Sequence, residues 1–560
     1  MSATSATSAT PASPLVNDHQ APHSPQKRLP RASPAVGQVA RWLLPSVSSF
    51  CLLLTLCLLL MNSWRFLQDS DTGWHIRTGD LIRQTGAVPH QDVFSYTMPG
   101  QAWFAWEWLA DVLMSAMHSR YGLAGLSGGT LLLLCLSYSL LFRAMMTRRA
   151  DPFIACALTI FAAMASIVHW LARPHVISIV LMLCWCALFE SWRHHRGTTT
   201  WGAGLIYAVP FLLALWANVH GAFAVTFPML VIYAAGETLE AASRGELKSR
   251  EYRSVMTTYA IVAVTSAIAT LATPYGFRLH QHLWLYLTDS RLLARIHEFQ
   301  SPDFHTVDGK LIELLLIFAV IAGARAAWQR RFIEVGLLLF WSHLTLQSER
   351  HVTLAVVVLM PIIAQHFSEL LRAAAKTLAN RAGRVAVTWR VMLTWYRGIM
   401  LIDRQLTGAF VYLAVTVFLL VLIGGRWGKL TDATLHPRFD EQKLPVAAAD
   451  FIAAAKLSGN LYAPDQFGGY LIYRFYPQRK VFVDGRSDFY RTGAVFDEFL
   501  RVATIRPDWA AILNRYDVRW MLLRSDEPLA TVALSTGQWH ELYRDSTAQV
   551  LVRKTVTGER

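Results

Sequence analysis

Stretches of about twenty apolar residues recur along this chain, and they limit its possible folds more than any other feature. A helix of that length crosses the hydrocarbon core of a bilayer, because each residue adds about 1.5 Å. Of the 560 residues, 54% are hydrophobic and only 16% are charged, too apolar for a surface that meets water everywhere. The sequence therefore predicts a polytopic all-α membrane domain. About eleven transmembrane helices are predicted, at 42–61, 124–144, 152–171, 175–192, 203–218, 221–236, 255–273, 311–328, 332–347, 351–367 and 408–425.

Basic residues alternate along the connections between these predicted spans. Cytoplasmic loops of membrane proteins are rich in Lys and Arg, so the basic connections are expected inside and the others outside. The net charge of +14 is therefore a topology signal, and no nucleic-acid partner is expected. The basic connections are 143–149, 193–196, 244–253, 325–331 and 372–404.

The composition changes at both ends of the apolar region. Residues 1–40 are rich in Ser, Ala, Thr and Pro, which predicts a disordered cytoplasmic tail. Residues 41–428 form the predicted transmembrane domain, with a first outer loop at 63–123. In 429–560, short β-runs alternate with helical patterns, which predicts a small soluble α/β domain. An odd number of spans from a cytoplasmic N-terminus places that domain outside.

The first outer loop begins with an acidic triplet directly after the first apolar run. Asp69 and Asp71 lie one residue apart, a spacing that suits a divalent cation such as Mg²⁺ or Mn²⁺, or a division of base and ligand roles. A solvated turn or a helix cap is the alternative interpretation. The cofactor stays open at this stage, with Asp69 and Asp71 as the candidate metal ligands.

Three very short outward connections each deliver Arg or His to the predicted outer interface. A bare charge there is costly, so such residues are functional candidates. Ordinary alternatives are an arginine that reaches lipid headgroups, a structural histidine, or pairing with a neighbouring carboxylate. The longer connection 274–310 has an amphipathic pattern near 283–287 and adds Glu298. The candidates in the short connections are Arg173, His175, His220, Arg350 and His351.

The motifs of these loops are similar to those of a known class. The pattern D-x-D-x-x-W-H-I-x-x-G, then P-x-x-D-x-F-S, W-x-x-x-E-W-L, W-x-N-x-H-G and S-E-R-H resembles bacterial integral-membrane glycosyltransferases of the GT-C class. That class includes the protein mannosyltransferases and the lipid A aminoarabinose transferases. The resemblance covers roughly residues 40–430, and the first loop carries its most specific part.

The resemblance implies a function and assigns roles to residues. The donor would be a sugar on a polyprenyl phosphate, and an acidic residue of the first outer loop would act in an inverting transfer on the outer face. The resemblance gives the acidic role to Asp69 or Asp71 without choosing between them, and the acceptor would be a lipid, a glycan or a protein. Asp71 is the preferred base, with Asp69 as the alternative, because Gly73 would let the backbone fold tightly and Trp74 could cover the sugar face. The expected location is a bacterial inner membrane. Donor phosphate would be bound by the five residues of the short connections, and the expected substrate-binding residues are Trp74, His75, Asp92, Glu107 and Glu298.

Two other functions are compatible with the sequence. One is an oligosaccharide transferase or ligase that uses a whole lipid-linked glycan. The other is a non-enzymatic transporter or assembly scaffold. Transporters often show two repeated halves and ionisable residues near the membrane midplane. The sequence has no evident internal repeat, and its ionisable residues gather near the outer face, so the transferase is favoured.

Overall fold

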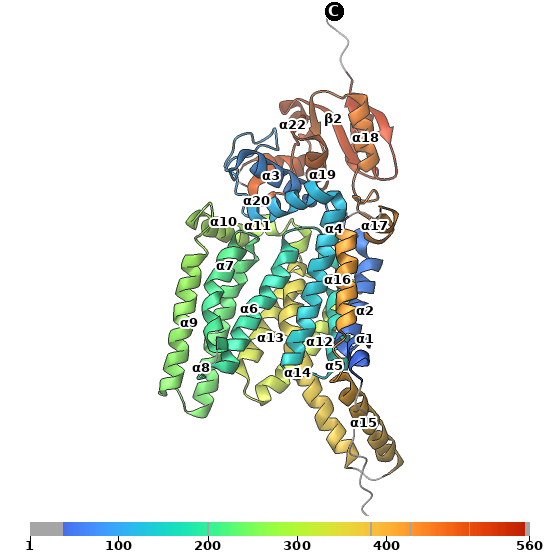
Figure 1. Cartoon of the computed structure of the whole chain (residues 1–560). Coiled ribbons are helices and arrows are strands. Elements are labelled where there is room, and N and C mark those ends of the chain that lie inside the picture. The colour runs from blue at the N-terminus through green and yellow to red at the C-terminus, as the bar shows by residue number, and fades with distance from the viewer. Residues whose placement is uncertain (1–36, 199–200, 381–382, 425–427, 492, 555–560) are drawn as a thin grey trace, which may run out of the picture.

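The computed structural model describes residues 37–554 apart from 199–200, 381–382, 425–427 and 492, so nearly all of the predicted tail 1–40 lies outside it. A bundle of long helices carries a smaller domain at one end (Figure 1). This end is called the domain end below, and the other is called the far end.

The bundle contains both long and short apolar helices. Its elements are α1 (Gln38–Leu43), α2 (Val47–Met61), α4 (Trp108–Thr147), α5 (Pro152–Ala165), η2 (Ile167–His169), α6 (His175–His195), η3 (Trp201–Ala208), α7 (Val209–Ala217), η4 (Gly221–Val225), α8 (Thr226–Arg244), α9 (Arg250–Ala269), α12 (Val307–Trp328), α13 (Phe332–Gln347), η6 (Glu349–His351), α14 (Val352–Ala379), α15 (Arg384–Asp403) and α16 (Ala409–Ile423). Helix α15 forms a hairpin with the end of α14 at the far end (Figure 1).

Six helices in the described part of the chain are long and apolar enough to cross a membrane. The number is up to seven if α16 and α17 (Gly428–Leu435) belong to one span. Shorter apolar helices at Pro152–Ala165, Trp201–Ala217 and Phe332–Gln347 fall on three further predicted spans. The polytopic membrane architecture is confirmed, whereas the count of eleven stays a prediction.

The first loop folds into ordered helices at the domain end. It forms η1 (Ser63–Leu67), α3 (Asp71–Thr85) and the start of α4. Gly86 ends α3 in the left-handed conformation, at φ 70°, which a glycine adopts without steric cost. Gly122 interrupts α4 at φ 63°, so the part before it packs on α3 and the part after it enters the bundle.

Residues after α16 form the second half of the domain end. Its helices are α17, α18 (Val446–Ala455), α19 (Asp465–Phe475), α20 (Ser487–Tyr490), α21 (Val495–Ala503), α22 (Trp509–Arg515) and α23 (Pro528–Ser535). The strands β1 (Asn460–Tyr462), β2 (Val518–Arg524), β3 (Trp539–Arg544) and β4 (Ala548–Arg553) form a sheet in the order β1-β2-β4-β3. Strands β1 and β2 run parallel and the other pairs antiparallel, which confirms the small α/β domain.

The first loop and the C-terminal domain share one hydrophobic core. Phe94 and Trp103 of the loop lie in the same buried cluster as Phe482 of the domain. The apolar run around Val481 forms a single bridge to Ser95 of the loop and does not join the sheet. Gly73 of α3 packs so closely on α19 that an added Cβ would collide with the Gly469 carbonyl oxygen. The two segments therefore form one rigid cap over the bundle.

Candidate functional site

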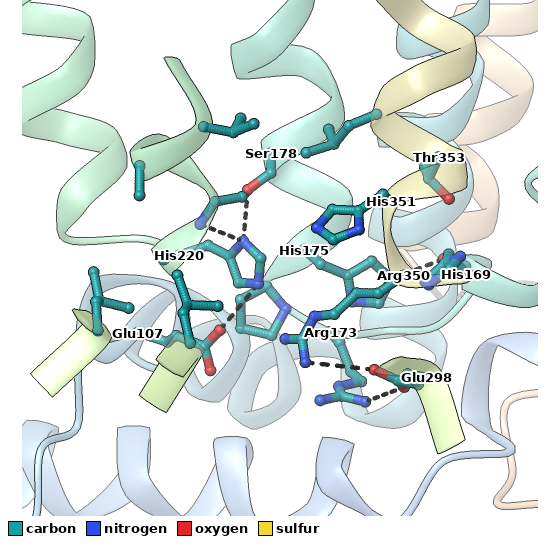
Figure 2. A pocket seen from close by; sticks show the side chains of 18 of the residues that line it. Glu107, His169, Arg173, His175, Ser178, His220, Glu298, Arg350, His351 and Thr353 are labelled. Carbon is teal, nitrogen blue, oxygen red and sulfur yellow. Dashed lines mark hydrogen bonds and ion pairs between the residues drawn. The ribbon is translucent and has the colours of Figure 1, made fainter. Parts of the chain in front are cut away.

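A cavity that is partly open to solvent lies between the cap and the domain end of the bundle (Figure 2). Several bundle helices begin at its wall, because the connections between them are very short. The amphipathic helix α10 (Phe277–Thr288) and η5 (His297–Phe299), which are joined through α11 (Ser290–Leu293), form another wall. The labelled polar lining in Figure 2 consists of Glu107, His169, Arg173, His175, Ser178, His220, Glu298, Arg350, His351 and Thr353.

The local sequence explains why these side chains meet. Pro174 precedes the first residue of α6, His175, and so fixes the start of that helix. The helix N-terminus carries a partial positive charge, which adds to the nearby arginines. His220 precedes η4, and its Nδ1 accepts a hydrogen bond from the Ala222 N–H. These turns place cationic and polar groups at one depth of the bundle.

Arg173 is the centre of the charged part of the site. Its Nη1 lies 2.9 Å from Asp69 Oδ2 and its Nη2 lies 3.0 Å from Asp71 Oδ2. The same guanidinium lies 3.6 Å from Glu298, which in turn lies 3.6 Å from Arg350. Burial alone would raise the pKa of Glu298, but the two arginines hold it at about 2. Glu298 is therefore a carboxylate that holds both arginines at the cavity.

Asp69 and Asp71 occupy the start of α3, and their roles differ. Asp69 Oδ1 accepts a hydrogen bond of 2.8 Å from the Asp71 N–H, so Asp69 orders the turn before the helix. Asp71 is 8% exposed, and Gly485 of the cap packs directly on its carboxylate. Burial raises the pKa of Asp71 to about 7, although Arg173 opposes the rise. Asp71 is thus a carboxyl group that can exchange a proton near neutral pH.

A divalent cation does not fit between these two aspartates as they stand. Arg173 contacts one oxygen of each, so a cation would meet a guanidinium in the place that joins them. The described residues contain no cluster of at least three His, Cys, Asp or Glu side chains arranged for a metal. A cation at Asp69 and Asp71 would require Arg173 to move.

Glu107 lies at the other side of the cavity between two histidines. Its Oε1 is 3.5 Å from His220 Nε2 and its Oε2 is 3.7 Å from His75 Nε2. His75 is fully buried, and its Nδ1 lies 2.6 Å from Asp111 Oδ1. Burial raises the pKa of Glu107 to about 7 and lowers the pKa values of His75 and His220. These groups form a buried network that can hold a proton.

The structure brings most of the predicted site residues together. Glu107, Glu298 and all five cations or histidines of the short connections line the cavity. Asp69 and Asp71 reach it through Arg173, and His75 reaches it through Glu107.

Two predicted substrate-binding residues lie away from the cavity lining. The Asp92 carboxylate is 3% exposed and binds Arg486 at 2.8 Å and the Ser95 hydroxyl at 2.6 Å, so it joins the loop to the C-terminal domain. Trp74 is buried, with its ring centre 3.6 Å from that of His75 in a tilted arrangement, and it packs edge-on against Trp103. Both side chains are packed inside the cap, and the indole N–H of Trp74 has no hydrogen-bond partner among the described residues.

Sequence reasoning missed several lining residues. His169 was counted inside the predicted span 152–171, but α5 ends at Ala165 and η2 brings His169 to the cavity. Its Nδ1 and the hydroxyl of Thr353 are buried and have no hydrogen-bond partner among the described residues. Tyr286 of α10 completes this set. A His-Trp pair at the end of an apolar run was the available signal for His169.

The lining suits an amphiphilic anion. Arg173 and Arg350 supply cations near the unpartnered polar atoms of His169 and Thr353. Leu283 and Leu287 of α10 supply apolar lining in the same cavity. A ligand with a phosphate-like head and a hydrocarbon tail matches both features.

Comparison with known proteins finds similar folds among solved structures. No family model and no curated protein matches the chain. The archaeal oligosaccharyltransferase AglB from Archaeoglobus fulgidus, solved with an inhibitory peptide and a dolichol-phosphate, superposes with a TM-score of 0.52 at 12% identity. The match covers 90% of this chain and 74% of that one. The apo form of that oligosaccharyltransferase gives a TM-score of 0.50 at 12% identity, covering 91% and 74%.

ArnT from Cupriavidus metallidurans bound to undecaprenyl phosphate also matches, with a TM-score of 0.45 at 16% identity. That match covers 90% of this chain and 98% of ArnT. The similarity to the archaeal structures shows that this chain has the GT-C fold over both its bundle and its cap.

Proposed function

We propose that this protein is a membrane glycosyltransferase that moves a sugar from a polyprenyl-phosphate donor to an acceptor on the outer side of the membrane. The observation that carries the proposal is the position of Arg173. It joins the anion-binding part of the cavity to the buried carboxyl group of Asp71, at the end of the membrane bundle. The GT-C fold, and the dolichol-phosphate named in the archaeal structure, support a lipid-linked donor.

The proposed chemistry is one displacement with inversion at the anomeric carbon. Asp71 accepts the proton of the acceptor hydroxyl as that oxygen bonds to the sugar. The bond from the sugar to the phosphate oxygen breaks, and its electron pair stays on the phosphate. Arg173 and Arg350 stabilise the charge that develops there, because hydrogen bonds between ionised groups are strong in a buried site. Glu298 fixes both arginines and so prepares the site before the donor binds.

Asp71 suits the role of base better than Asp69. Asp71 is held by the cap on one side and by Arg173 on the other, and burial raises its pKa to about 7. A base with a pKa near the working pH is the most effective. One carboxylate oxygen of Asp69 accepts a hydrogen bond at the start of α3, and the other pairs with Arg173.

Reconstitution tests the proposed function directly. Purified protein in liposomes is supplied with a panel of single-sugar polyprenyl phosphates and with a long lipid-linked glycan, and released polyprenyl phosphate is measured. We expect turnover of at least one single-sugar donor, which the long glycan inhibits poorly. Preferential use of the long glycan would support an oligosaccharide transferase instead. No release from any donor would contradict the transferase.

The orientation of the protein is part of the proposal. The basic connections lie at the far end of the bundle and the cap at the domain end, which supports a cytoplasmic N-terminus and an external cap. A reporter that is active only in the cytoplasm, fused after Arg560, should stay silent. Reporter activity would place the cavity on the wrong side for an external acceptor.

A further inference from the structure

Helix α15 at the far end of the bundle has two apolar faces, and the protein covers only one of them (Figure 1). The covered face repeats at steps of three and four residues, as one side of a helix does, and consists of Ala386, Trp389, Leu393, Tyr396 and Met400, all buried or partly buried. A second set repeats in the same way but is exposed, and we call it the exposed stripe: Val385, Met392, Trp395, Ile399 and Ile402. Val385 is 75% exposed and Trp395 is 74% exposed, so nothing in the described chain packs over this stripe.

Polar contacts hold α15 at the level where bundle helices end. Asp403 Oδ1 accepts a hydrogen bond of 2.7 Å from the Val47 N–H at the start of α2, a helix long and apolar enough to cross a membrane together with α1. The Tyr396 hydroxyl donates to Asp151, which caps the start of α5. Both contacts lie where a bundle helix begins, so α15 lies where the bundle leaves the hydrocarbon core of the bilayer.

Three arginines form a row along one edge of the same helix. Arg390, Arg397 and Arg404 recur every seven residues, a spacing that keeps them on one side. Arg390 donates to the Ala379 carbonyl oxygen at 3.0 Å and so fastens α15 to the end of α14. Arg397 and Arg404 are exposed and form no ion pair within the described part of the chain. From 370 to 404 the sequence contains seven Lys or Arg residues and one acid, Asp403, so this segment is strongly basic.

We propose that α15 is an interfacial helix that binds anionic phospholipid at the far end of the bundle. The exposed stripe enters the boundary between headgroups and acyl chains, and the arginine row contacts the headgroup phosphates. Trp395 suits the middle of the stripe, because indole rings are favoured at this boundary. The inference goes beyond the proposed function, since it needs only the membrane architecture of the fold and not the transfer reaction.

Charge favours a lipid over a second copy of the chain as the occupant of this surface. Two copies that paired through the exposed stripe would bring two arginine rows close together, and like charges repel. Asp403 cannot offset that repulsion, because its carboxylate already accepts from the start of α2. Anionic headgroups supply the opposite charge beside an apolar layer, which is the same arrangement that α15 presents.

Photochemical crosslinking of the full chain identifies what covers the exposed stripe. The photoreactive amino acid p-benzoylphenylalanine replaces Trp395, whose exposure makes the change mild for folding. The protein is placed in nanodiscs that contain equal amounts of phosphatidylglycerol and phosphatidylcholine, irradiated, and analysed by mass spectrometry. We expect a phospholipid adduct. The same amino acid in place of Leu542, an exposed apolar residue of β3 in the cap, should give none.

The ratio of the two lipid adducts tests the arginine row. We expect at least about threefold more adduct with phosphatidylglycerol than with phosphatidylcholine, because each arginine near an anionic surface adds attraction. The double variant Arg397→Gln, Arg404→Gln keeps the bond from Arg390 to Ala379 and should at least halve that ratio. The control Lys480→Gln, Arg506→Gln removes two positive charges from exposed positions of the cap and should leave the ratio unchanged.

Each other outcome would overturn the proposal. An adduct with a second copy of the chain would make the exposed stripe a contact between proteins, and the absence of any lipid adduct would place the stripe in water. Equal labelling of the two lipids, or a ratio that the Arg397→Gln, Arg404→Gln variant leaves unchanged, would show that the arginine row does not bind headgroups. Sugar transfer is not measured in these experiments, so their failure would leave the proposed transferase standing.

Discussion

Two clusters at the domain end place an arginine between two aspartates, and they differ in what surrounds them. The Arg173 triad consists of Arg173, Asp69 and Asp71, with contacts of 2.9 and 3.0 Å. The Arg486 triad consists of Arg486, Asp92 and Asp484, with contacts of 2.8 and 2.7 Å. The pairing distances alone do not distinguish them.

Enclosure separates the two triads. The Arg486, Asp92 and Asp484 side chains are 1%, 0% and 0% exposed. The Arg486 guanidinium also lies 4.5 Å from the centre of the Trp103 ring. The three side chains of the Arg173 triad are 12% to 20% exposed, and Arg173 lines the cavity. A closed triad can only hold the loop to the domain, whereas an open one can exchange a partner for substrate.

In the Arg173 triad, removal of the Asp71 charge should have the largest effect on sugar transfer. Asp71→Asn keeps the shape but cannot accept a proton, so we expect transfer to fall by about a hundredfold to ten-thousandfold. The free energy of unfolding should change by only about 1 kcal/mol, because burial raises the pKa of Asp71 to about 7 and the site therefore already accepts a neutral side chain of this shape near neutral pH. Turnover in liposomes and thermal unfolding measure the two effects. Asp69→Asn, the matched control in the same triad, should lose less activity.

Near-wild-type transfer in the Asp69→Asn, Asp71→Asn double variant would remove the catalytic role from the first loop. The wild-type protein and the single variants must then be compared at equal amounts of folded protein.

Substitution in the Arg486 triad should lower stability and leave the activity of the folded protein unchanged. Asp92→Asn leaves Arg486 buried with one fewer charged partner, and breaking a buried pair costs about 3 kcal/mol or more. We therefore expect a lower unfolding temperature and easier proteolysis between the loop and the C-terminal domain. The rate per folded molecule should remain close to that of the wild type. If Asp92→Asn had wild-type stability but no activity, the result would support the substrate-binding role that was predicted from the sequence for Asp92.

The sequence predicted the bundle and the C-terminal α/β domain because hydrophobic run length and β-runs are local signals. It also predicted that Arg173, His220 and Arg350 would meet, since short connections must place their charges at one depth. It assigned Asp71 to catalysis and Asp92 to substrate binding, but it did not show that the Asp92 side chain is enclosed while that of Asp71 is partly open. Both are acids of the same loop, and their difference comes from Gly485 and Arg486, about 400 residues later in the chain.

The position of His169 at the cavity was also not predicted, and the His-Trp pair was its one local signal. The apolar run continues through it, and only the packing of η2 ends the helix early. The hydrogen bonds around His220 depend on Ser178 and Trp216, which belong to different helices. Contacts of that kind leave no local pattern.

Substitution of Arg173 should have an intermediate effect, which is measured as the affinity for a polyprenyl phosphate. Lysine keeps the positive charge but cannot contact both aspartates and a phosphate through a planar fork. We expect Arg173→Lys to weaken binding of a polyprenyl phosphate by about tenfold, and Arg173→Ala to weaken it further. Fluorescence titration with the lipid phosphate in nanodiscs measures this. The same pair of changes at Arg350 should give a smaller loss, because Arg350 contacts neither aspartate. Unchanged affinity in both alanine variants would refute phosphate binding by these residues.

The smallest effect is expected from removal of divalent cations. This experiment tests whether Arg173, rather than a cation, occupies the position between Asp69 and Asp71. Arg173 Nη1 and Nη2 already contact Asp69 and Asp71 at 2.9 and 3.0 Å, so a cation there would have to displace a guanidinium from both carboxylates. Like charges at that distance repel strongly in a partly buried site. We therefore expect a chelator to change the rate of wild-type transfer by less than about twofold, a difference worth under 0.5 kcal/mol. Arg173→Ala opens the position between the aspartates, and added Mn²⁺ or Mg²⁺ should bind more tightly to that variant than to the wild type. A large loss on chelation, restored by Mn²⁺ or Mg²⁺, would mean that Arg173 moves aside when the donor binds and that the open triad is a metal site.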